Sequence, residues 1–461
     1  MYLLNKKSIG KNGYSLIKDE LTDIQIKQLK KDLAVLPKVC QNYGLAEDKT
    51  EPIILYKENE EKIYIPRYFG INKYGTVDKF KIQKAQCANL NFNSELRSHQ
   101  KHIVECYTKN IDSKIGGGGI ICAGCGVGKT VISLFIASHL KVKTLVIVHK
   151  EFLMNQWIDR INEFLPGAKV GTIQGTKTDV VDKDIVIGML QSVSMHKYEN
   201  SIFDDFGLAI YDECHHLGAR VFSKALRKTN FKYTLGLSAT PTRKDGLTKV
   251  FLWYLGDIVY KQEKTDDSNI DVYIYHYINS DTTYCKEELN FKKQIMNPKI
   301  INNIAKCKKR NDYIISLIPN LISQNRTILI LTERIAQVDY IYDKVKEFEM
   351  TTIGKYIGKL RQDVLDESLK CRIIIGTYNM IEEGFDCKSL DTLIMATPKV
   401  DIEQSIGRIL RKQKEERTIK PLVIDIYDKF ANNINKGKKR ITFYKKQKYT
   451  IKTYNIDDNK T

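Results

Sequence analysis

Residues 120–140 read IICAGCGVGKTVISLFIASHL, and this stretch decides the fold. Three apolar residues lead into a loop of mostly small residues, and Lys129 and Thr130 then open a segment with helical spacing. A strand, a glycine-rich loop and a helix in this order form the context of a phosphate-binding loop, because glycines let backbone amides close around phosphate oxygens. The alternative interpretation is a glycine-rich turn before a buried helix, without a ligand.

A phosphate-binding loop assigns a role to each of its polar residues. Lys129 would contact the β- and γ-phosphates of a nucleotide, and Thr130 would hold Mg²⁺. The usual pattern is GxxxxGK[ST], and this chain has Ala123 at its first position. The loop positions around the phosphates would be Ala123, Gly124, Cys125, Gly126, Val127 and Gly128.

The composition limits the class of protein. The chain has 461 residues, 42% of them hydrophobic, which is enough for two or three domains. Lys and Arg number 74 and Asp and Glu 55, so the formal net charge is +19. This charge is typical either of a polyanion-binding protein or of a lysine-rich composition without such a partner.

Cysteine spacing and hydropathy exclude several other classes. Cys122 and Cys125 form a CxxC pair, but no second pair completes a four-thiolate zinc site, and the ten cysteines are expected to be reduced. No apolar stretch has the length of a signal-peptide core or of a membrane span of ~18 residues. We therefore expect a soluble, intracellular protein that does not contact a membrane.

The chain alternates strand-like and helical segments from about residue 91. The nearly continuous apolar runs are typical of parallel sheets covered on both faces. We expect strands at 120–123, 144–149, 185–188, 208–211, 234–238, 327–331, 372–377, 392–396 and 421–426, and helices at 129–140 and 152–164. A polar interval at roughly 261–310 separates two groups of strands.

We therefore predict an α/β fold with two tandem parallel-sheet lobes and a small N-terminal α/β module. The expected parts are the N-terminal module at 1–90, a first lobe at 91–262, a second lobe at 263–430 and a basic aromatic tail at 431–461. The tail interleaves lysines with aromatic residues, a composition that suits phosphate contact with base stacking. The alternative for the tail is a strand or helix packed on the second lobe.

Two acids follow the apolar segment FGLAIY at 206–211. We assign Asp212 to hold Mg²⁺ through water and Glu213 to orient and deprotonate an attacking water. The alternative is a charged exit from a strand. The later segment LGLSATPTRKDG at 235–246 places the hydroxyls of Ser238 and Thr240 at the end of another strand, where they can hydrogen-bond back to the acids.

The second lobe carries a candidate cationic face in DIEQSIGRILRK at 401–412. Helical spacing would put Gln404, Gly407, Arg408 and Arg411 on one face. Arginines from a different lobe than the phosphate-binding loop suit the stabilisation of charge on a γ-phosphate. Salt bridges on a surface helix are the alternative.

Taken together, these segments resemble the superfamily 2 helicases over about residues 91–430. AGCGVGKT is similar to motif I of that family, DECH to motif II, SAT to motif III and QSIGRILR to motif VI. TLVIVHKEFLMNQW at 144–157 resembles motif Ia, DIVIGMLQSV at 184–193 the nucleic-acid motifs that follow, ILILTER at 328–334 motif IV, and GTYNMIEEGFD at 376–386 motif V. LRSHQ at 96–100 ends in Gln100, where the family has a glutamine that reads adenine.

Within the superfamily, HKEFLMNQW and LGLSATPTRKDG are most similar to the XPB-like branch, whose members act mainly on DNA. That branch includes the phage branch-migration helicase and helicases of poxviruses and other large DNA viruses, whose single-chain layout this chain resembles. Residues 243–245 read RKD, whereas the XPB proteins have Arg-Glu-Asp there. A viral origin would imply a cytoplasmic or virion location.

The resemblance implies two RecA-like lobes that close on ATP and Mg²⁺. Gly384 and Asp386 would lie near the nucleotide, and His215, Ser238 and Thr240 would couple its hydrolysis to nucleic acid. One strand would cross both lobes and make sequence-tolerant backbone contacts. The candidate contacts are His149, Lys150, Gln191, Ser192, Thr332, Arg334 and Thr377.

The leading hypothesis is an ATP-dependent helicase or translocase that acts on DNA, with replication, repair or transcription machinery as possible partners. The first alternative is an RNA helicase, because RNA motors of the same superfamily share every ATPase residue named above. The second is an ATP-gated nucleic-acid clamp or transcript-release factor that translocates without unwinding.

Overall fold

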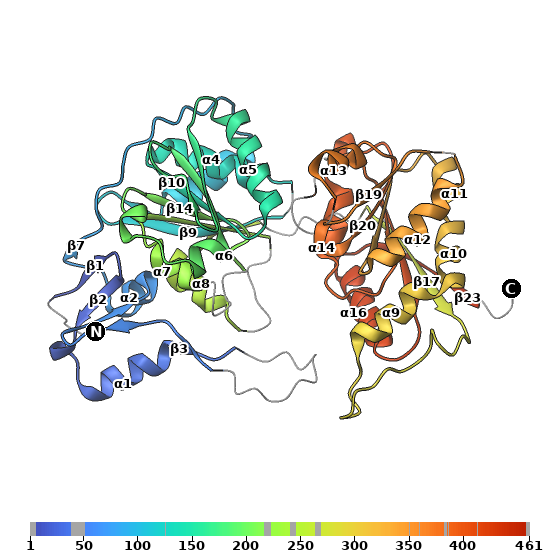
Figure 1. Cartoon of the computed structure of the whole chain (residues 1–461), viewed down its shortest axis with the longest axis horizontal. Helices are drawn as coiled ribbons and strands as arrows, with labels where there is room; N and C mark the ends of the chain where they lie inside the picture. Colours follow the sequence, from blue (N-terminus) through green and yellow to red (C-terminus); the bar gives the residue numbers. More distant parts are fainter. Residues whose placement is uncertain are drawn as a thin grey trace. The chain divides into compact units, whose positions relative to one another are not determined.

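The structure is a computed structural model of the whole chain (Figure 1). It describes residues 6–37, 51–124, 126–215, 223–239, 246–262, 269–349, 351–358, 360–381, 385, 387–412 and 414–457. The chain forms two compact units, Met1–Glu263 (unit 1) and Lys264–Thr461 (unit 2). Within the ranges described, no helix is both long and apolar enough to cross a membrane.

Unit 1 is built on a sheet in which parallel strands dominate. The strand order is β12-β11-β13-β10-β14-β15-β9-β16, and β8 pairs antiparallel with β9 outside that path. All other neighbours are parallel except β11 and β12. The strands are β8 (Ile111–Asp112), β9 (Gly116–Cys122), β10 (Thr144–Val148), β11 (Val170–Gln174), β12 (Lys177–Thr178), β13 (Ile185–Met189), β14 (Leu208–Tyr211), β15 (Tyr233–Ser238) and β16 (Ile258–Lys261).

Helices cover both faces of this sheet, as the continuous apolar strands predict. One face packs on α3 (Ser98–Thr108), α4 (Lys129–Leu140) and α5 (Glu151–Phe164). The other packs on α6 (Leu190–Met195), α7 (Ser223–Lys228) and α8 (Thr248–Leu255). The two helices and the four strands after 123 that we predicted in this unit are confirmed to within one residue at either end.

The four glycines 116–119 lie inside β9, so the predicted strand start at 120 is wrong. Each of these residues is buried, and neighbouring chains approach where side chains would stand. A Cβ on Gly118 would collide with the Thr234 hydroxyl, and one on Gly119 with Val259. Only glycine therefore allows β9 to sit between its neighbours at these positions.

The N-terminal segment packs on the second face of unit 1. Its own sheet has the order β5-β6-β2-β1-β7, and Phe69 on α2 meets Trp253 on α8 edge to face at a ring distance of 4.9 Å. The buried Arg67 donates to the carbonyls of Phe231 and Lys232 at 3.2 and 3.0 Å. The elements are β1 (Ser8–Gly10), β2 (Gly13–Ile17), η1 (Lys18–Glu20), α1 (Asp23–Asp32), β3 (Ala34–Val35), β4 (Ile53–Ile54), β5 (Lys57–Glu58), β6 (Lys62–Ile65), α2 (Arg67–Tyr74) and β7 (Lys79–Phe80).

Unit 2 contains a fully parallel sheet of the order β19-β20-β18-β21-β22-β17-β23. Helices α9 to α12 pack on one face and α13 to α16 on the other. The strands are β17 (Asp271–Ile278), β18 (Ile328–Thr332), β19 (Ile353–Tyr356), β20 (Ile373–Thr377), β21 (Thr392–Met395), β22 (Leu422–Asp428) and β23 (Thr450–Asp457). The helices are α9 (Asn297–Lys306), α10 (Lys308–Ser316), α11 (Ile318–Ser323), α12 (Ile335–Lys346), α13 (Gln362–Leu369), α14 (Tyr378–Ile381), α15 (Glu403–Gly407) and α16 (Asn433–Lys446), with 3-10 turns η4 (Arg408–Leu410) and η5 (Lys414–Glu416).

The interval 261–310, which the sequence marks as polar, contains an interior strand of this sheet. β17 lies between β22 and β23, so the interval is part of the core of unit 2 rather than a separator. Alternating polar and apolar residues in DVYIYHYI hide the strand from a search for continuous apolar runs. The mixed α/β fold with two parallel sheets is confirmed.

The basic aromatic tail supplies α16 and β23, which belong to the fold of unit 2. Arg440 on α16 is buried and makes two hydrogen bonds of 2.8 Å to the Asp425 carboxylate on β22. Tyr444 donates to the same carboxylate at 2.9 Å. A buried charge needs a partner, so the tail neutralises a carboxylate that the sheet would otherwise hold unpaired.

We expect Arg440→Leu to lower the free energy of unfolding of unit 2 by about 3–5 kcal/mol, because Asp425 would stay buried without its cation. Circular dichroism reports urea unfolding of both units, whereas tryptophan fluorescence reports only unit 1, which holds Trp157 and Trp253. The dichroism transition should move to lower urea while the fluorescence transition stays in place. Lys439→Ala, at an exposed neighbour, is the control. Equal transitions for Arg440→Leu and the control would contradict this role of the ion pair.

Candidate nucleotide site

The candidate site of unit 1 lies where β14, β15 and β9 end. These three strands are adjacent and parallel, with Tyr211 opposite Gly236 and Ser238 opposite Cys122. Their carboxyl ends therefore share one edge of the sheet, which is where open α/β sheets bind ligands. The small-residue loop follows β9, the acid pair follows β14, and Ser238 ends β15.

The loop between β9 and α4 has the backbone of a phosphate-binding loop. Gly126 and Gly128 have φ angles of +89° and +87°, in the left-handed region that favours glycine. Gly128 caps α4, so the first free amides of that helix face the loop. Cys125 lies outside the described residues. The amide of Ala123 donates to the Ser238 carbonyl at 3.0 Å and ties the loop to β15.

Lys129 turns its side chain back into the loop. Its Nζ donates to the carbonyls of Ala123 at 2.8 Å and Gly124 at 3.3 Å. The ammonium group is thereby held next to the amides of the loop, where a phosphate would need it. Thr130 is the second residue of α4 and is half-buried.

Gln100 is buried on α3, and both ends of its amide are engaged within the protein. Its Nε2 donates to the Val127 carbonyl at 3.1 Å, and its Oε1 accepts from the Arg97 amide at 3.0 Å. The residue thus ties α3 to the loop. Adenine recognition by Gln100 stays a prediction.

The acid pair stands in a buried, strained turn. Burial and the charge of Glu213 raise the pKa of the Asp212 carboxyl above its ordinary value. Asp212 Oδ1 accepts from the Glu213 amide at 3.1 Å. Glu213 has a φ of +46°, which costs a non-glycine residue of order 1 kcal/mol and is typical of functional sites.

His215 lies between the acid pair and β15. Its Nδ1 is 3.0 Å from the Ser238 hydroxyl and 3.3 Å from Glu213 Oε2. The structure therefore brings together Glu213, His215 and Ser238 from two strand ends. Thr240 lies outside the described residues.

Two residues that the sequence reasoning did not assign hold this site in place. Trp157 on α5 is buried and donates from Nε1 to Asp212 Oδ2 at 2.9 Å, which lowers the pKa of Asp212 against the effect of burial. Gln262, directly after β16, accepts from the Gly124 amide at 2.7 Å through its Oε1. Trp157 is the last residue of the quoted motif Ia segment, but Gln262 has no sequence signal because it opens the polar interval.

The donor set at this edge fits Mg²⁺. Thr130 brings a hydroxyl and Asp212 a carboxylate, and Mg²⁺ takes hard oxygen donors of this kind. Among the residues that the structure describes, no group of three or more His, Cys, Asp or Glu side chains could hold a metal ion. A Mg²⁺ here would therefore share its ligands with nucleotide phosphates and water, as it does at many nucleotide sites.

The nucleic-acid candidates of unit 1 differ in how far their side chains are accessible. His149 and Lys150 follow β10 and are half-buried, and Gln191 near the start of α6 is exposed. Ser192 is buried, and its hydroxyl accepts from the Gly175 amide at 2.8 Å. The predicted contact through the Ser192 side chain therefore does not fit the structure, whereas the other three fit.

The arginines of the second lobe do not share one helical face as predicted. The α-helix ends at Gly407, and Arg408 begins a 3-10 turn, which changes the angular spacing of the side chains. Arg408 and Arg411 nonetheless donate to the same carbonyl, that of Phe385, at 2.7 and 2.9 Å. Gln404 is half-buried on α15. Gly384 and Asp386, which flank Phe385, lie outside the described residues.

The remaining candidates of unit 2 end two neighbouring strands. Thr332 on β18 is fully buried and contacts Gln337, so its predicted contact with nucleic acid does not fit the structure. Arg334 donates to the Pro298 carbonyl at 3.1 Å, and Thr377 is half-buried at the end of β20.

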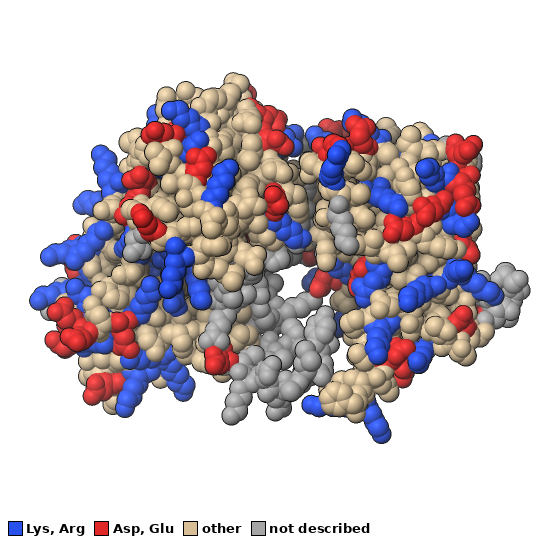
Figure 2. All heavy atoms as spheres, viewed as in Figure 1, with Lys and Arg blue, Asp and Glu red and all other residues tan. Residues whose placement is uncertain are grey.

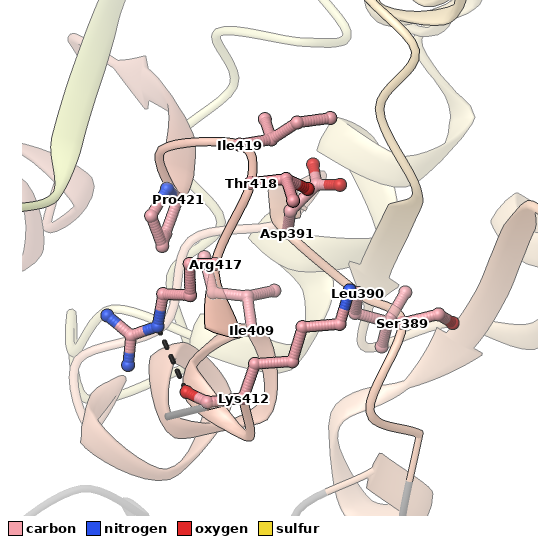
Figure 3. Close-up of a pocket in the computed structure, with 9 residues that line it drawn as sticks. All are labelled: Ser389, Leu390, Asp391, Ile409, Lys412, Arg417, Thr418, Ile419 and Pro421. Atoms are coloured by element: carbon pink, nitrogen blue, oxygen red, sulfur yellow. Dashed lines mark hydrogen bonds between the residues drawn. The ribbon is translucent and has the colours of Figure 1, made fainter. Parts of the chain in front are cut away.

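A pocket of unit 2 lies apart from all of these residues (Figure 3). It is lined by Ser389, Leu390, Asp391, Ile409, Lys412, Arg417, Thr418, Ile419 and Pro421. Arg417 donates to the Lys412 carbonyl at 3.0 Å, and Asp391 accepts from the Thr327 amide at 3.0 Å, so its polar groups serve the local fold. None of the predicted site residues lines this pocket.

Comparison with known proteins identifies similar chains over nearly the full length. The model of the type III restriction enzyme res subunit matches residues 93–243. A mimivirus protein named as an ATP-dependent RNA helicase is 37% identical over 98% of this chain and 88% of its own. A helicase of invertebrate iridescent virus 6 is 26% identical over 92% of this chain and 98% of its own. An African swine fever virus protein named as an ATP-dependent RNA helicase is 26% identical over 85% of this chain and 81% of its own.

Solved structures show the same fold. A fragment of an HsdR subunit of a type I restriction enzyme from Vibrio vulnificus aligns with a TM-score of 0.56 at 15% identity, over 80% of this chain and 70% of that one. Dbp5 of S. cerevisiae, bound to RNA and ADP-BeF3, aligns with a TM-score of 0.50 at 14% identity, over 74% and 86%. At these identities the likeness concerns the fold alone.

We expect Trp157→Phe to raise the Mg²⁺ concentration needed for half-maximal ATP hydrolysis by about tenfold, because Asp212 loses the donor that orients its carboxylate. Calorimetric titration with ADP, with and without Mg²⁺, should show a loss of affinity only when Mg²⁺ is present. Trp253→Phe, which removes the other indole of unit 1, is the control. An equal Mg²⁺ requirement in the two variants would contradict the prediction.

Proposed function

Because this chain belongs to the superfamily 2 helicases of large DNA viruses, we propose that it translocates on DNA and separates strands by hydrolysing ATP. Use of ATP and binding of nucleic acid follow from the family. The observation that carries the proposal is the shared strand edge of unit 1. There Lys129 lies inside the loop, and Glu213 and His215 meet Ser238 from the neighbouring strand.

The chemistry we assign to this edge is hydrolysis of the γ-phosphate. Loop amides and Lys129 bind the phosphates, and Glu213 takes a proton from the attacking water. A bound Mg²⁺, held by Thr130 and through water by Asp212, would neutralise phosphate charge. Burial of Asp212 excludes bulk water from one side of the site and strengthens each electrostatic interaction there.

His215 and Ser238 are placed to couple this chemistry to nucleic acid. A shift of β15 would move the Ser238 hydroxyl and thereby the imidazole that lies 3.3 Å from Glu213. The strained φ of Glu213 leaves that carboxylate sensitive to such a shift, because a strained turn persists only while its surroundings hold it.

Unit 2 contributes positive charge in this proposal. By the resemblance, Gln404, Arg408 and Arg411 stabilise the charge that develops on the γ-phosphate during hydrolysis. The shared Phe385 carbonyl orients both guanidinium groups before any ligand binds, which reduces the reorganisation needed. Nucleic-acid contacts are proposed at His149, Lys150, Gln191, Arg334 and Thr377.

DNA is the first candidate substrate, and RNA is the second. The segments HKEFLMNQW and LGLSATPTRKDG favour DNA through their similarity to the XPB-like branch. The names of the mimivirus and African swine fever virus relatives favour RNA. The net charge of +19 is equally suited to either polyanion.

We expect single-stranded or branched DNA to stimulate steady-state ATP hydrolysis by at least about tenfold at one fixed salt concentration, and RNA of equal length to stimulate it less. The physical reason is that backbone contacts across the two units favour the hydrolytic arrangement. Lys129→Ala is the control and should hydrolyse ATP at a background rate with either polymer.

Stronger stimulation by RNA would replace DNA as the substrate and favour the second candidate. A strand-displacement assay on a forked duplex separates unwinding from translocation alone. Stimulated hydrolysis without displacement would support the clamp or transcript-release alternative.

A further inference from the structure

A large aromatic side chain stands almost fully in solvent between β17 and α9. The exposed fraction of Phe291 is 88%, the highest of any large hydrophobic residue that the structure describes. Leu289 and Ile295 beside it are also exposed. Apolar side chains gathered in this way at a protruding position mark interaction surfaces more often than single exposed residues do.

Backbone hydrogen bonds shape residues 288–296 into a small hairpin, here named the 288–296 hairpin. Leu289 and Ile295 form an antiparallel bridge, and the Met296 amide donates to the Glu288 carbonyl at 2.7 Å. At the tip, Asn290 Oδ1 accepts from the amides of Lys292 and Gln294 at 2.9 Å each. The fold therefore presents Phe291 at a defined place.

The tip is basic. Lys292 and Lys293 follow Phe291, both are exposed, and neither is paired with a carboxylate in the part of the chain described. The Lys292 ammonium lies 5.9 Å from the centre of the Phe291 ring. Of the two acids at the base, Glu288 is 3.3 Å from Lys286, and Glu287 is exposed. Figure 2 shows blue side chains on both sides of this projecting segment of unit 2.

The base of the hairpin is fixed to the helix that holds a candidate nucleic-acid contact. The Met296 carbonyl accepts from the amides of Lys299 and Ile300 in the first turn of α9. Arg334 binds the same helix through the Pro298 carbonyl at 3.1 Å and Asn302 Oδ1 at 2.5 Å. The hairpin and Arg334 are thus rigidly connected within unit 2.

We propose that the 288–296 hairpin binds a single nucleic-acid strand, with Phe291 stacked on an unpaired base and Lys292 and Lys293 on the adjoining phosphates. An aromatic ring flanked by lysines is the chemistry of sequence-tolerant single-strand binding, in which every base offers a π face. The inference rests on the nucleic-acid binding of the proposed function and assigns it a site outside the conserved-type motifs. A protein partner would need a broader apolar surface than this narrow tip with two cations.

The test measures the affinity of the full chain for a fluorescein-labelled 20-nucleotide strand, as DNA and as RNA, at several salt concentrations. Phe291→Ala should weaken binding by about tenfold, the order of one lost stacking contact, and Phe291→Trp should restore it. Lys292→Ala with Lys293→Ala should reduce the steepness of the salt dependence by about one to two released counterions. A 2-aminopurine placed along the strand should lose its quenching in Phe291→Ala.

Matched controls come from the same unit. Val364→Ala removes an exposed apolar side chain from α13, and Lys308→Ala with Lys309→Ala removes an adjacent exposed pair from α10. Both controls should bind the strand like the wild-type chain. Unchanged affinity in Phe291→Ala and Phe291→Trp, with a wild-type chain that binds, would overturn the hairpin proposal alone. A wild-type chain that binds neither DNA nor RNA would overturn the proposed function and the hairpin with it.

Discussion

The candidate nucleotide site depends on the parallel pairing of β9 with β15 and of β15 with β14. This pairing ends three strands at one edge, so the loop, the acids and Ser238 become neighbours although more than 100 residues separate Cys122 from Ser238. The glycines of β9 permit the pairing, because a side chain on Gly118 would collide with Thr234 of β15. The glycines therefore serve two separate needs: those at 116–119 allow close strand packing, and those at 126 and 128 shape the loop.

Unit 2 relies on buried ion pairs where unit 1 relies on glycine. Arg310 pairs with Asp428, and Arg440 pairs with Asp425, both fully inside the unit. Each arginine also donates to a backbone carbonyl just after β21, that of Ala396 or Lys399. The chain between these carbonyls leads into α15 and its arginines, so the ion pairs fix where that segment starts. Buried pairs of this kind give specificity of arrangement, since their removal leaves an uncompensated charge.

The sequence predicts most strands that are continuous apolar runs and the helix that follows the loop, because burial on both faces leaves a strong hydrophobic signal. It does not predict β17 or the glycine half of β9, where alternation or the lack of side chains removes that signal. At the site, local patterns indicate Lys129 and the acid pair. The bonds of Trp157 and Gln262 join segments 55 and 138 positions apart, so only tertiary structure shows them. The 3-10 turn at Arg408 likewise follows from packing and not from residue spacing.

The central claim is that Glu213 activates water at a nucleotide held by the loop of unit 1. Glu213→Gln keeps the size of the side chain and removes its basicity, so it tests this claim most directly. The measurement is single-turnover hydrolysis of ATP by the full chain, with ATP and nucleic-acid affinity determined on the same preparation. The account predicts that Glu213→Gln binds both ligands like the wild-type chain and loses hydrolysis by about 100-fold or more. Hydrolysis at the wild-type rate would contradict the account.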